Sequence, residues 1–173
     1  MRPSISCIVG DFGSGKTLFM TYLAYLNKDH RRVFANYHLK DIPYTHIDIS
    51  DLATFRDDLR NAIVLLDEGQ VGANAYDIFK KDVRDISQFI TQIRKRNIIM
   101  FWSTQRFRRV ALPLRELTKY FYEMQPTEVD GISHVKIFDI DNGYEFIKEF
   151  MFNGIPMFNK YDTEEIIMKK ETK

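Results

Sequence analysis

Cysteine and long apolar runs are scarce in this sequence of 173 residues. The single cysteine, Cys7, cannot form an internal disulfide, and we expect a buried thiol that packs as a small hydrophobic group. This cysteine usage fits a reducing compartment. Because no apolar run reaches about 18 residues, no transmembrane helix is predicted. The N-terminus leaves no room for a signal sequence before a glycine-rich loop, so we expect a cytoplasmic protein.

Charge of one sign is not in excess either. The 25 Lys and Arg residues nearly balance the 24 Asp and Glu residues, and the net charge of +1 excludes a general attraction to nucleic acid. The distribution is uneven, because residues 94–109 contain six Lys or Arg and no acid, which predicts a local basic surface. The four histidines lack metal-ligand spacing, and none is given a ligand role: His30, His38, His46 and His134.

No repeat, low-complexity tract or linker divides the chain, so we expect one domain over residues 1–167 and a charged tail at 168–173. Apolar runs alternate with segments of helical periodicity, which predicts an α/β fold of three layers, with a mainly parallel sheet and helices on both faces. The expected strands are 4–9, 32–39, 62–68, 97–105 and 120–124, with a short extended stretch at 43–50. The expected helices are 16–27, 51–60 with Ser50 as its cap, and 76–96 with Phe79, Val83, Ile86, Ile90 and Ile93 on its apolar face.

The last third of the chain changes character. Two alternating apolar and polar stretches flank the sequence "DNG" at 141–143. Asn-Gly between such stretches is a strong signal for a β-hairpin. We therefore expect residues 132–150 to form an antiparallel hairpin appended to the parallel sheet.

The stretch "GDFGSGKT" matches the phosphate-binding pattern G-x-x-x-x-G-K-[ST] in full, between a predicted strand and a predicted helix. In such a loop the backbone N–H groups and the helix N-terminus converge on a phosphate. Lys16 would reach the β- and γ-phosphates and Thr17 would ligate Mg²⁺, so ATP and Mg²⁺ are the expected cofactors. The expected nucleotide-binding residues are Gly10, Asp11, Phe12, Gly13, Ser14, Gly15, Lys16 and Thr17.

Two acids end the buried run at 62–68, and a glutamine ends the run at 97–105. Asp67 would hold the metal, Glu68 would polarise the attacking water, and Gln105 would contact the γ-phosphate. The Asp-Glu order is typical of ATPases that drive motion, whereas the D-x-x-G and N-K-x-D motifs of GTPases are missing. Two simpler interpretations stay open. Asp67 and Glu68 could cap a helix, and Gln105 could be only a polar residue at the end of a strand.

Five stretches occur in one consistent order: "GDFGSGKT", "VFANYHL", "VLLDEGQ", "QIRKRNIIMFWSTQ" and "FNKYDT". Together they are similar to the Zot-like and FtsK/HerA group, the ATPases of filamentous phage assembly, viral genome packaging and DNA translocation. The resemblance implies a RecA/FtsK-like P-loop fold of the additional-strand class. It also implies a trans-acting arginine shortly before the Gln105 strand, where Arg94 is favoured over Arg96 by its distance from Gln105.

The resemblance implies a motor that packages a viral genome or moves the DNA of a mobile element. The expected partners are double-stranded DNA, further copies in a ring (hexamer or pentamer), and capsid or virion membrane proteins. Zot-like proteins generally continue into a membrane span, and no such span is predicted in this sequence. We therefore expect a minimal motor in the host cytoplasm or with the virion. Arg106, Arg108 and Arg109 would contact DNA phosphates, or else lie solvated or between subunits. Three alternatives stay open: a Zot-like virion-assembly ATPase acting on proteins at a membrane, a soluble P-loop kinase, and a regulatory nucleotide-binding module.

Overall fold

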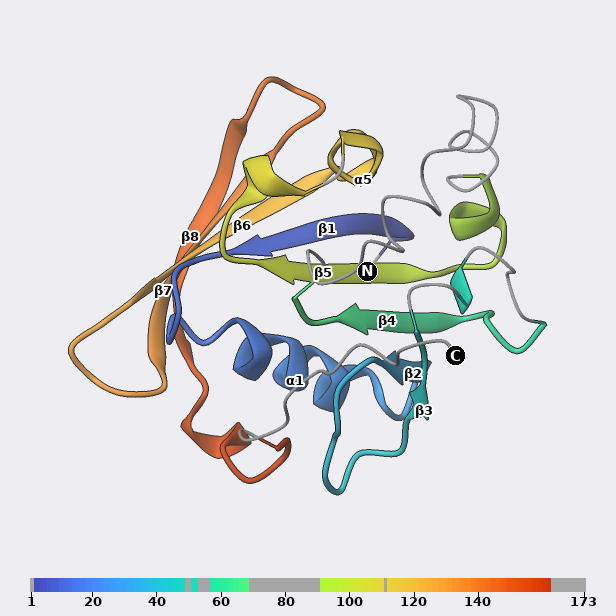
Figure 1. The fold of residues 1–173 in the computed structure, drawn as a ribbon, viewed down its shortest axis with the longest axis horizontal. Helices are drawn as coiled ribbons and strands as arrows, with labels where there is room; N and C mark the ends of the chain where they lie inside the picture. The colour runs from blue at the N-terminus through green and yellow to red at the C-terminus, as the bar shows by residue number, and fades with distance from the viewer. Residues whose placement is uncertain (1, 49–50, 53–56, 69–90, 111, 163–173) are drawn as a thin grey trace, which may run out of the picture.

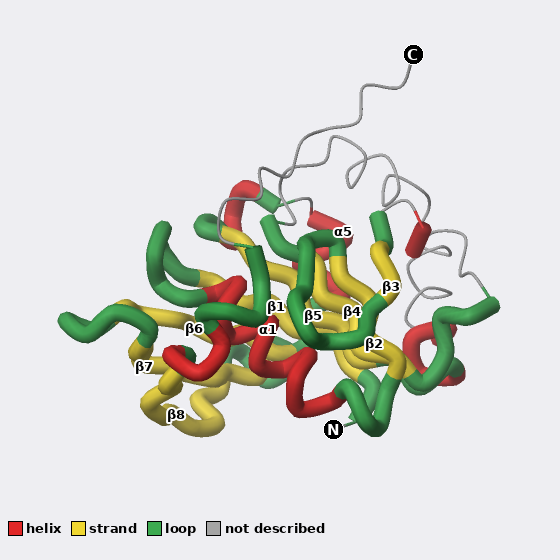
Figure 2. Tube along the Cα trace, turned by 90° about the horizontal axis from the view of Figure 1, so that it is seen from below, coloured by secondary structure: helices red, strands yellow, loops and turns green. Residues whose placement is uncertain are grey.

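Eight strands form one sheet within the residues that the computed structural model describes, which are 2–48, 51–52, 57–68, 91–110 and 112–162. The strand order is β3-β2-β4-β5-β1-β6-β7-β8, so β7 and β8 lie at one end of the sheet and β2 and β3 at the other (Figures 1 and 2). The strands are β1 (Ser4–Val9), β2 (Arg32–Ala35), β3 (Thr45–His46), β4 (Ala62–Leu66), β5 (Ile99–Thr104), β6 (Tyr120–Pro126), β7 (Ile132–Asp139) and β8 (Glu145–Asn153).

The first six strands pair in parallel, as the alternation of strands and helices predicts. Every residue of β4 and β5 is buried, because layers of side chains cover both faces of these central strands. Cys7 on β1 is also buried, and the burial raises the pKa of its thiol. The continuous apolar runs of the sequence therefore correspond to strands with two buried faces.

Helices cover both faces of the sheet, in agreement with the expected three layers (Figure 1). On one face α1 (Lys16–Asn27) packs Phe19 and Leu23 into one core cluster. On the other face α5 (Leu112–Leu117) buries Leu114 in a second cluster, together with Ile93 from the helical turn at 91–95. Two short 3-10 helices, η1 (Phe107–Arg109) and η2 (Ile155–Met157), follow β5 and β8. No helix among the described residues is long and apolar enough to cross a membrane.

The β-hairpin expected at 132–150 is present and runs to Asn153. Strands β7 and β8 pair antiparallel, and β7 also pairs antiparallel with β6. The turn differs from a two-residue Asn-Gly loop. Five residues, 140–144, connect the strands, since Asp139 faces Glu145 across the hairpin. The N–H of Gly143 donates to the carbonyl of Ile140 at 3.0 Å, which closes the turn.

Three predicted strands, and the short extended stretch at 43–50, cover fewer residues than expected. The strand expected at 97–105 spans Ile99–Thr104. The strand expected at 32–39 ends at Ala35, because the side chain of Asn36 hydrogen-bonds across to the neighbouring strand end. The strand expected at 62–68 ends at Leu66, so that both acids lie in a turn. In the stretch expected to extend over 43–50, only Thr45–His46 pairs as a strand among the described residues.

Two predicted helices are described only in part. Residues 51–52 are helical and 57–60 form a turn, whereas Ser50 and residues 53–56 lie outside the described residues. Of the helix expected at 76–96, residues 91–95 are described as helical. The apolar positions before Ile93 in that helix lie outside the described residues: Phe79, Val83, Ile86 and Ile90.

Candidate nucleotide-binding site

The glycine-rich loop connects the C-terminal end of β1 to the N-terminus of α1, as predicted. Gly10 has no room for a side chain, because a Cβ there would lie 2.5 Å from the carbonyl oxygen of Met124. Gly15 caps α1 without a side-chain hydrogen bond, and the first turn of α1 contains no acid. The first turn of a helix leaves N–H groups without intrahelical partners, and Lys16, Thr17 and Leu18 of this turn line the cleft, so this end of α1 favours an anion.

Lys16 lies over this loop. Its Nζ donates hydrogen bonds to the carbonyl oxygens of Gly10 and Asp11, both at 2.9 Å. Burial lowers the pKa of the Lys16 amine, while the nearby carboxylates of Asp67 and Glu68 act in the opposite direction. The Lys16 amine therefore lies next to the loop backbone, as a phosphate-binding loop requires.

Asp67 lies beside the first turn of α1. Its Oδ2 accepts a hydrogen bond from the Thr17 hydroxyl at 2.6 Å, and its Oδ1 accepts one from the Ser103 hydroxyl. Asp67 is buried, with 9% of its surface exposed. A carboxylate and a threonine hydroxyl in contact are hard oxygen ligands of the kind that Mg²⁺ prefers. These residues fit a magnesium ion held between the loop and β4, and the backbone cradle fits a nucleotide phosphate.

Asn36 fixes the peptide of Asp67, a role that the sequence analysis missed. Asn36 Oδ1 accepts from the N–H of Asp67 at 2.7 Å, and Asn36 Nδ2 donates to its carbonyl at 3.0 Å. The only sequence signal was the asparagine in "VFANYHL", directly after an apolar strand. Ser103, near the end of β5, was also missed, although it is a buried polar residue in an apolar run.

Glu68 and Gln105 line the same cleft as Lys16, Thr17 and Asp67. Glu68 has a positive φ of 49°, an uncommon conformation for a residue with a side chain. Its N–H donates to Ser103 Oγ at 2.9 Å and to Asp67 Oδ1 at 3.1 Å, which holds the strained turn in place. The structure thus brings together the loop, the acid pair and the glutamine that the sequence predicted as one site.

The cleft has a volume of about 640 Å³ and a second wall that sequence reasoning did not find. This wall comes from the β6–β7 connection with the strand ends beside it, within residues 126–133, and from the segment after β8, which includes Phe158 and Tyr161. Ser133 anchors the wall to the loop, because its hydroxyl donates to the carbonyl of Ser14 at 2.9 Å. The appended hairpin is therefore part of the site.

Two of the stretches that carry the family resemblance, "VFANYHL" and "FNKYDT", pair with each other. Leu39 forms a β-bridge with Tyr161, and the N–H of Lys40 donates to the carbonyl of Lys160 at 2.7 Å. An ion pair of 3.0 Å joins Lys160 to Asp41. Burial and the neighbouring Asp67 raise the pKa of Tyr161. This pairing closes one side of the cleft.

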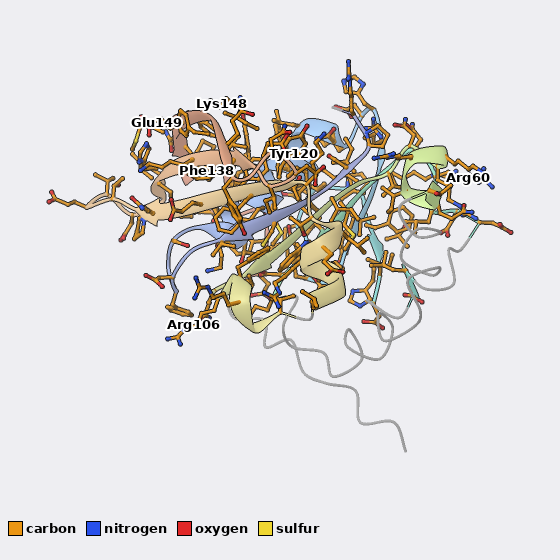
Figure 3. The ribbon with its side chains drawn as sticks, turned by 90° about the horizontal axis from the view of Figure 1, so that it is seen from above. Arg60, Arg106, Tyr120, Phe138, Lys148 and Glu149 are labelled. Atoms are coloured by element: carbon orange, nitrogen blue, oxygen red, sulfur yellow. The ribbon has the colours of Figure 1, made fainter. Side chains whose placement is uncertain are left out.

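The basic residues predicted to have a role lie at the two opposite ends of strand β5. Arg106 and Arg108 are exposed just beyond β5, at the cleft edge, and Arg109 ends η1. Arg94 is exposed and Arg96 is half-buried before β5 begins, and the Arg96 carbonyl accepts from the N–H of Asn61 at 2.8 Å. Figure 3 shows Arg106 and Arg60, the residue next to Asn61, at opposite ends of the molecule.

Solved structures of low sequence identity share this fold. The N-terminal domain of zonular occludens toxin from Neisseria meningitidis matches with a TM-score of 0.66 at 18% identity, covering 94% of this chain and 100% of that chain. B204, the DNA-packaging ATPase from Sulfolobus Turreted Icosahedral Virus, matches with a TM-score of 0.56 at 15% identity, covering 88% and 98%. The RadB recombinase matches with a TM-score of 0.59 at 14% identity, covering 88% and 87%. No protein-family model and no curated protein matches the sequence.

These similarities show that the chain has the α/β fold of the P-loop NTPases. They confirm, for the fold, the resemblance to the Zot-like domain and to a viral packaging ATPase. B204 from Sulfolobus turreted icosahedral virus 2 has been solved in complex with ATP-gammaS and with AMPPCP. What those proteins bind or move is a property of theirs, and its transfer to this chain is a proposal.

Proposed function

We propose that this protein is an ATP-hydrolysing motor of a virus or mobile element that moves double-stranded DNA, with packaging of a genome into a capsid as its role. The proposal rests on one observation: five residues predicted to act together line one cleft. They are Lys16, Thr17, Asp67, Glu68 and Gln105. The fold similarity to B204, the DNA-packaging ATPase, supports the choice of DNA as the substrate of motion. The protein would act in the host cytoplasm or with the virion.

The residues of the cleft divide the work of hydrolysis between them. The loop backbone and Lys16 hold the phosphate chain, and Thr17 with Asp67 holds the metal. When bound, Mg²⁺ neutralises part of the charge that develops on the phosphates. Glu68 orients and polarises the attacking water, and its fixed N–H keeps the carboxylate near the cleft. Gln105, from the neighbouring strand end, contacts the γ-phosphate and responds to its loss.

Arg94 and Arg96 precede β5, at the end of the strand that lies away from the cleft. In this proposal they act only on the site of a neighbouring subunit. Strand β5 has six residues, so Arg94 lies roughly 20 Å from the cleft edge, too far for its side chain to reach its own site. Arg94 would therefore serve as an arginine finger for the neighbouring copy in a ring of five or six. Arg96 is the less favoured finger, because its Nε already donates to Gln92 at 3.2 Å.

A Zot-like virion-assembly ATPase is the second candidate function. The N-terminal domain of zonular occludens toxin is covered over its whole length by this chain and has the higher TM-score, 0.66 against 0.56. In that case the cleft chemistry is the same, but the motion acts on virion proteins at a membrane and not on DNA.

Duplex DNA separates the two candidates. Phosphate release is measured with and without linear duplex DNA over a protein concentration series. We expect DNA to raise the rate severalfold and the rate per subunit to rise with concentration as rings form. Hydrolysis without any response to DNA would contradict the packaging motor and favour the assembly ATPase.

The basic residues beyond β5 give the same experiment a second arm. Replacing Arg106, Arg108 and Arg109 together with Ala should weaken DNA binding and lower its salt slope by roughly one unit for each lost phosphate contact. The matched control is Arg60→Ala, an exposed arginine at the opposite end of the molecule (Figure 3). An unchanged salt slope in the triple variant would remove these arginines from the DNA contact.

A further inference from the structure

One end of the cleft carries apolar side chains that are unusually exposed. Val129, in the β6–β7 connection, is 54% exposed, and Phe158, just after η2, is 42% exposed. Ile155, at the start of η2, is 44% exposed. Val129 and Phe158 both line the cleft. No residue of this group takes part in the phosphate or metal chemistry described above.

These side chains belong to a wall whose two segments are hydrogen-bonded to each other. The N–H of Gly154 donates to the carbonyl of Gly131 at 2.8 Å, so the segment after β8 is tied to the β6–β7 connection. Gly131 has a φ of 79°, and a Cβ there would lie 2.5 Å from Cζ of Phe158 and 3.1 Å from Cγ1 of Ile155. The Phe158 ring therefore packs directly on the Gly131 backbone. Figure 1 shows η2 turning back toward α1 at this end of the molecule.

The strand order decides which half of a nucleotide meets this wall. Strand β1 lies between β5 and β6, so the loop that follows β1 has β4 and β5 on one side and β6 and β7 on the other. Asp67, the proposed metal ligand, and Gln105, the proposed γ-phosphate contact, follow β4 and β5. Because the terminal phosphate points to that side, the nucleoside half of the chain points toward β6, β7 and Phe158.

We propose that this wall is the nucleoside pocket, in which the base packs against the Phe158 ring with Val129 at its edge. This inference rests on the proposed nucleotide binding and specifies which residues contact the base. Stacking on an aromatic ring is available to every base, because each has a π-face. The adjacent Thr127 hydroxyl already donates to the Ile132 carbonyl at 2.9 Å and accepts from the N–H of Val129 at 3.2 Å, so its hydrogen bonds are made within the wall. Phe158 positions the nucleotide and takes no part in bond breaking.

The test compares ATP, supplied as its non-hydrolysable analogue AMPPCP, with inorganic tripolyphosphate, which has the phosphates but no base. Both are titrated calorimetrically, with Mg²⁺, into the wild type and Phe158→Ala. We expect ATP to bind about tenfold more weakly to Phe158→Ala, the size of a lost base–aromatic stack, and tripolyphosphate to bind within about twofold of the wild type. The matched control is Phe146→Ala on β8, which removes a phenyl group that is 53% exposed and does not line the cleft.

Each further result supports or contradicts the pocket. Phe158→Leu, which keeps an apolar group on Gly131, should lose part of the ATP affinity, and it replaces the alanine variant if that protein does not fold. Equal ATP affinity in the wild type and both Phe158 variants would overturn the inference, as would an equal loss for ATP and tripolyphosphate. A wild type that binds neither compound would instead refute the proposed function, so the two failures are distinguishable.

Discussion

Asn36 and Asp67 lie 31 residues apart in the chain, yet two hydrogen bonds join them. The side chain of Asn36 bonds both the N–H and the carbonyl of the Asp67 peptide, at the point where β4 ends. Asp67 is then directed toward Thr17 by hydrogen bonds from two hydroxyls. A single amide thus holds the backbone that carries the carboxylate on which the predicted metal site depends.

Replacing Asn36 with Ala tests this arrangement. The variant leaves a half-buried peptide without its two partners, so we expect a loss of roughly 1–3 kcal/mol in the free energy of unfolding, measured in urea. Hydrolysis should also fall by about tenfold, since Asp67 is no longer held, and excess Mg²⁺ should restore part of it. The control is Asn142→Ala in the exposed hairpin turn. Full activity of Asn36→Ala at limiting Mg²⁺ would show that Asp67 does not need this support.

At the scale of elements, the buried strands were the most predictable part of the fold. The apolar runs of β4 and β5 predicted buried strands, and Asn-Gly between β7 and β8 predicted an antiparallel pair, and both predictions are confirmed. Strand ends were less predictable, because β2 stops where Asn36 bonds to a distant peptide, a contact that local sequence does not record. The short helix α5 was not predicted, since its six residues carry too little periodicity.

The candidate site also has a part that the sequence predicts and a part that it does not. The loop, Asp67, Glu68 and Gln105 were predictable because phosphate chemistry requires particular residue types at fixed places after strands. The wall around Phe158 was not, since an exposed phenylalanine after a hairpin has no motif. Only the strand order, with β1 between β5 and β6, brings that wall beside the loop.

At the scale of the whole molecule, the cleft lies at the C-terminal ends of the parallel strands and Arg94 lies at their N-terminal ends. A site with Lys16 and a metal leaves part of the transition-state charge uncompensated, and an inserted arginine contributes on the order of 10³-fold or more in rate. The separation means that this arginine would come from a second copy. Contacts between two different surfaces of the subunit are head-to-tail, and they form a ring when the rotation from one copy to the next closes.

Mixing two inactive variants tests this assembly. Arg94→Ala keeps a sound cleft, and Lys16→Ala keeps a sound arginine, so a mixture of the two should recover part of the activity that each lacks alone. Arg96→Ala mixed in the same way identifies the finger if Arg94 is not the one. If the mixture stays inactive while light scattering shows that both variants assemble together, Arg94 is ruled out as an arginine acting between subunits.

The central claim is that the cleft hydrolyses ATP with Glu68 as the residue that polarises water. The most direct measurement is phosphate release by Glu68→Gln beside its ATP affinity, with Lys16→Ala and the exposed Glu145→Gln on β8 as comparisons. We predict that Glu68→Gln binds ATP and Mg²⁺ like the wild type but turns over at least about 10²-fold more slowly. Lys16→Ala should lose binding itself, and Glu145→Gln should match the wild type. A Glu68→Gln protein that releases phosphate at the wild-type rate would contradict the account.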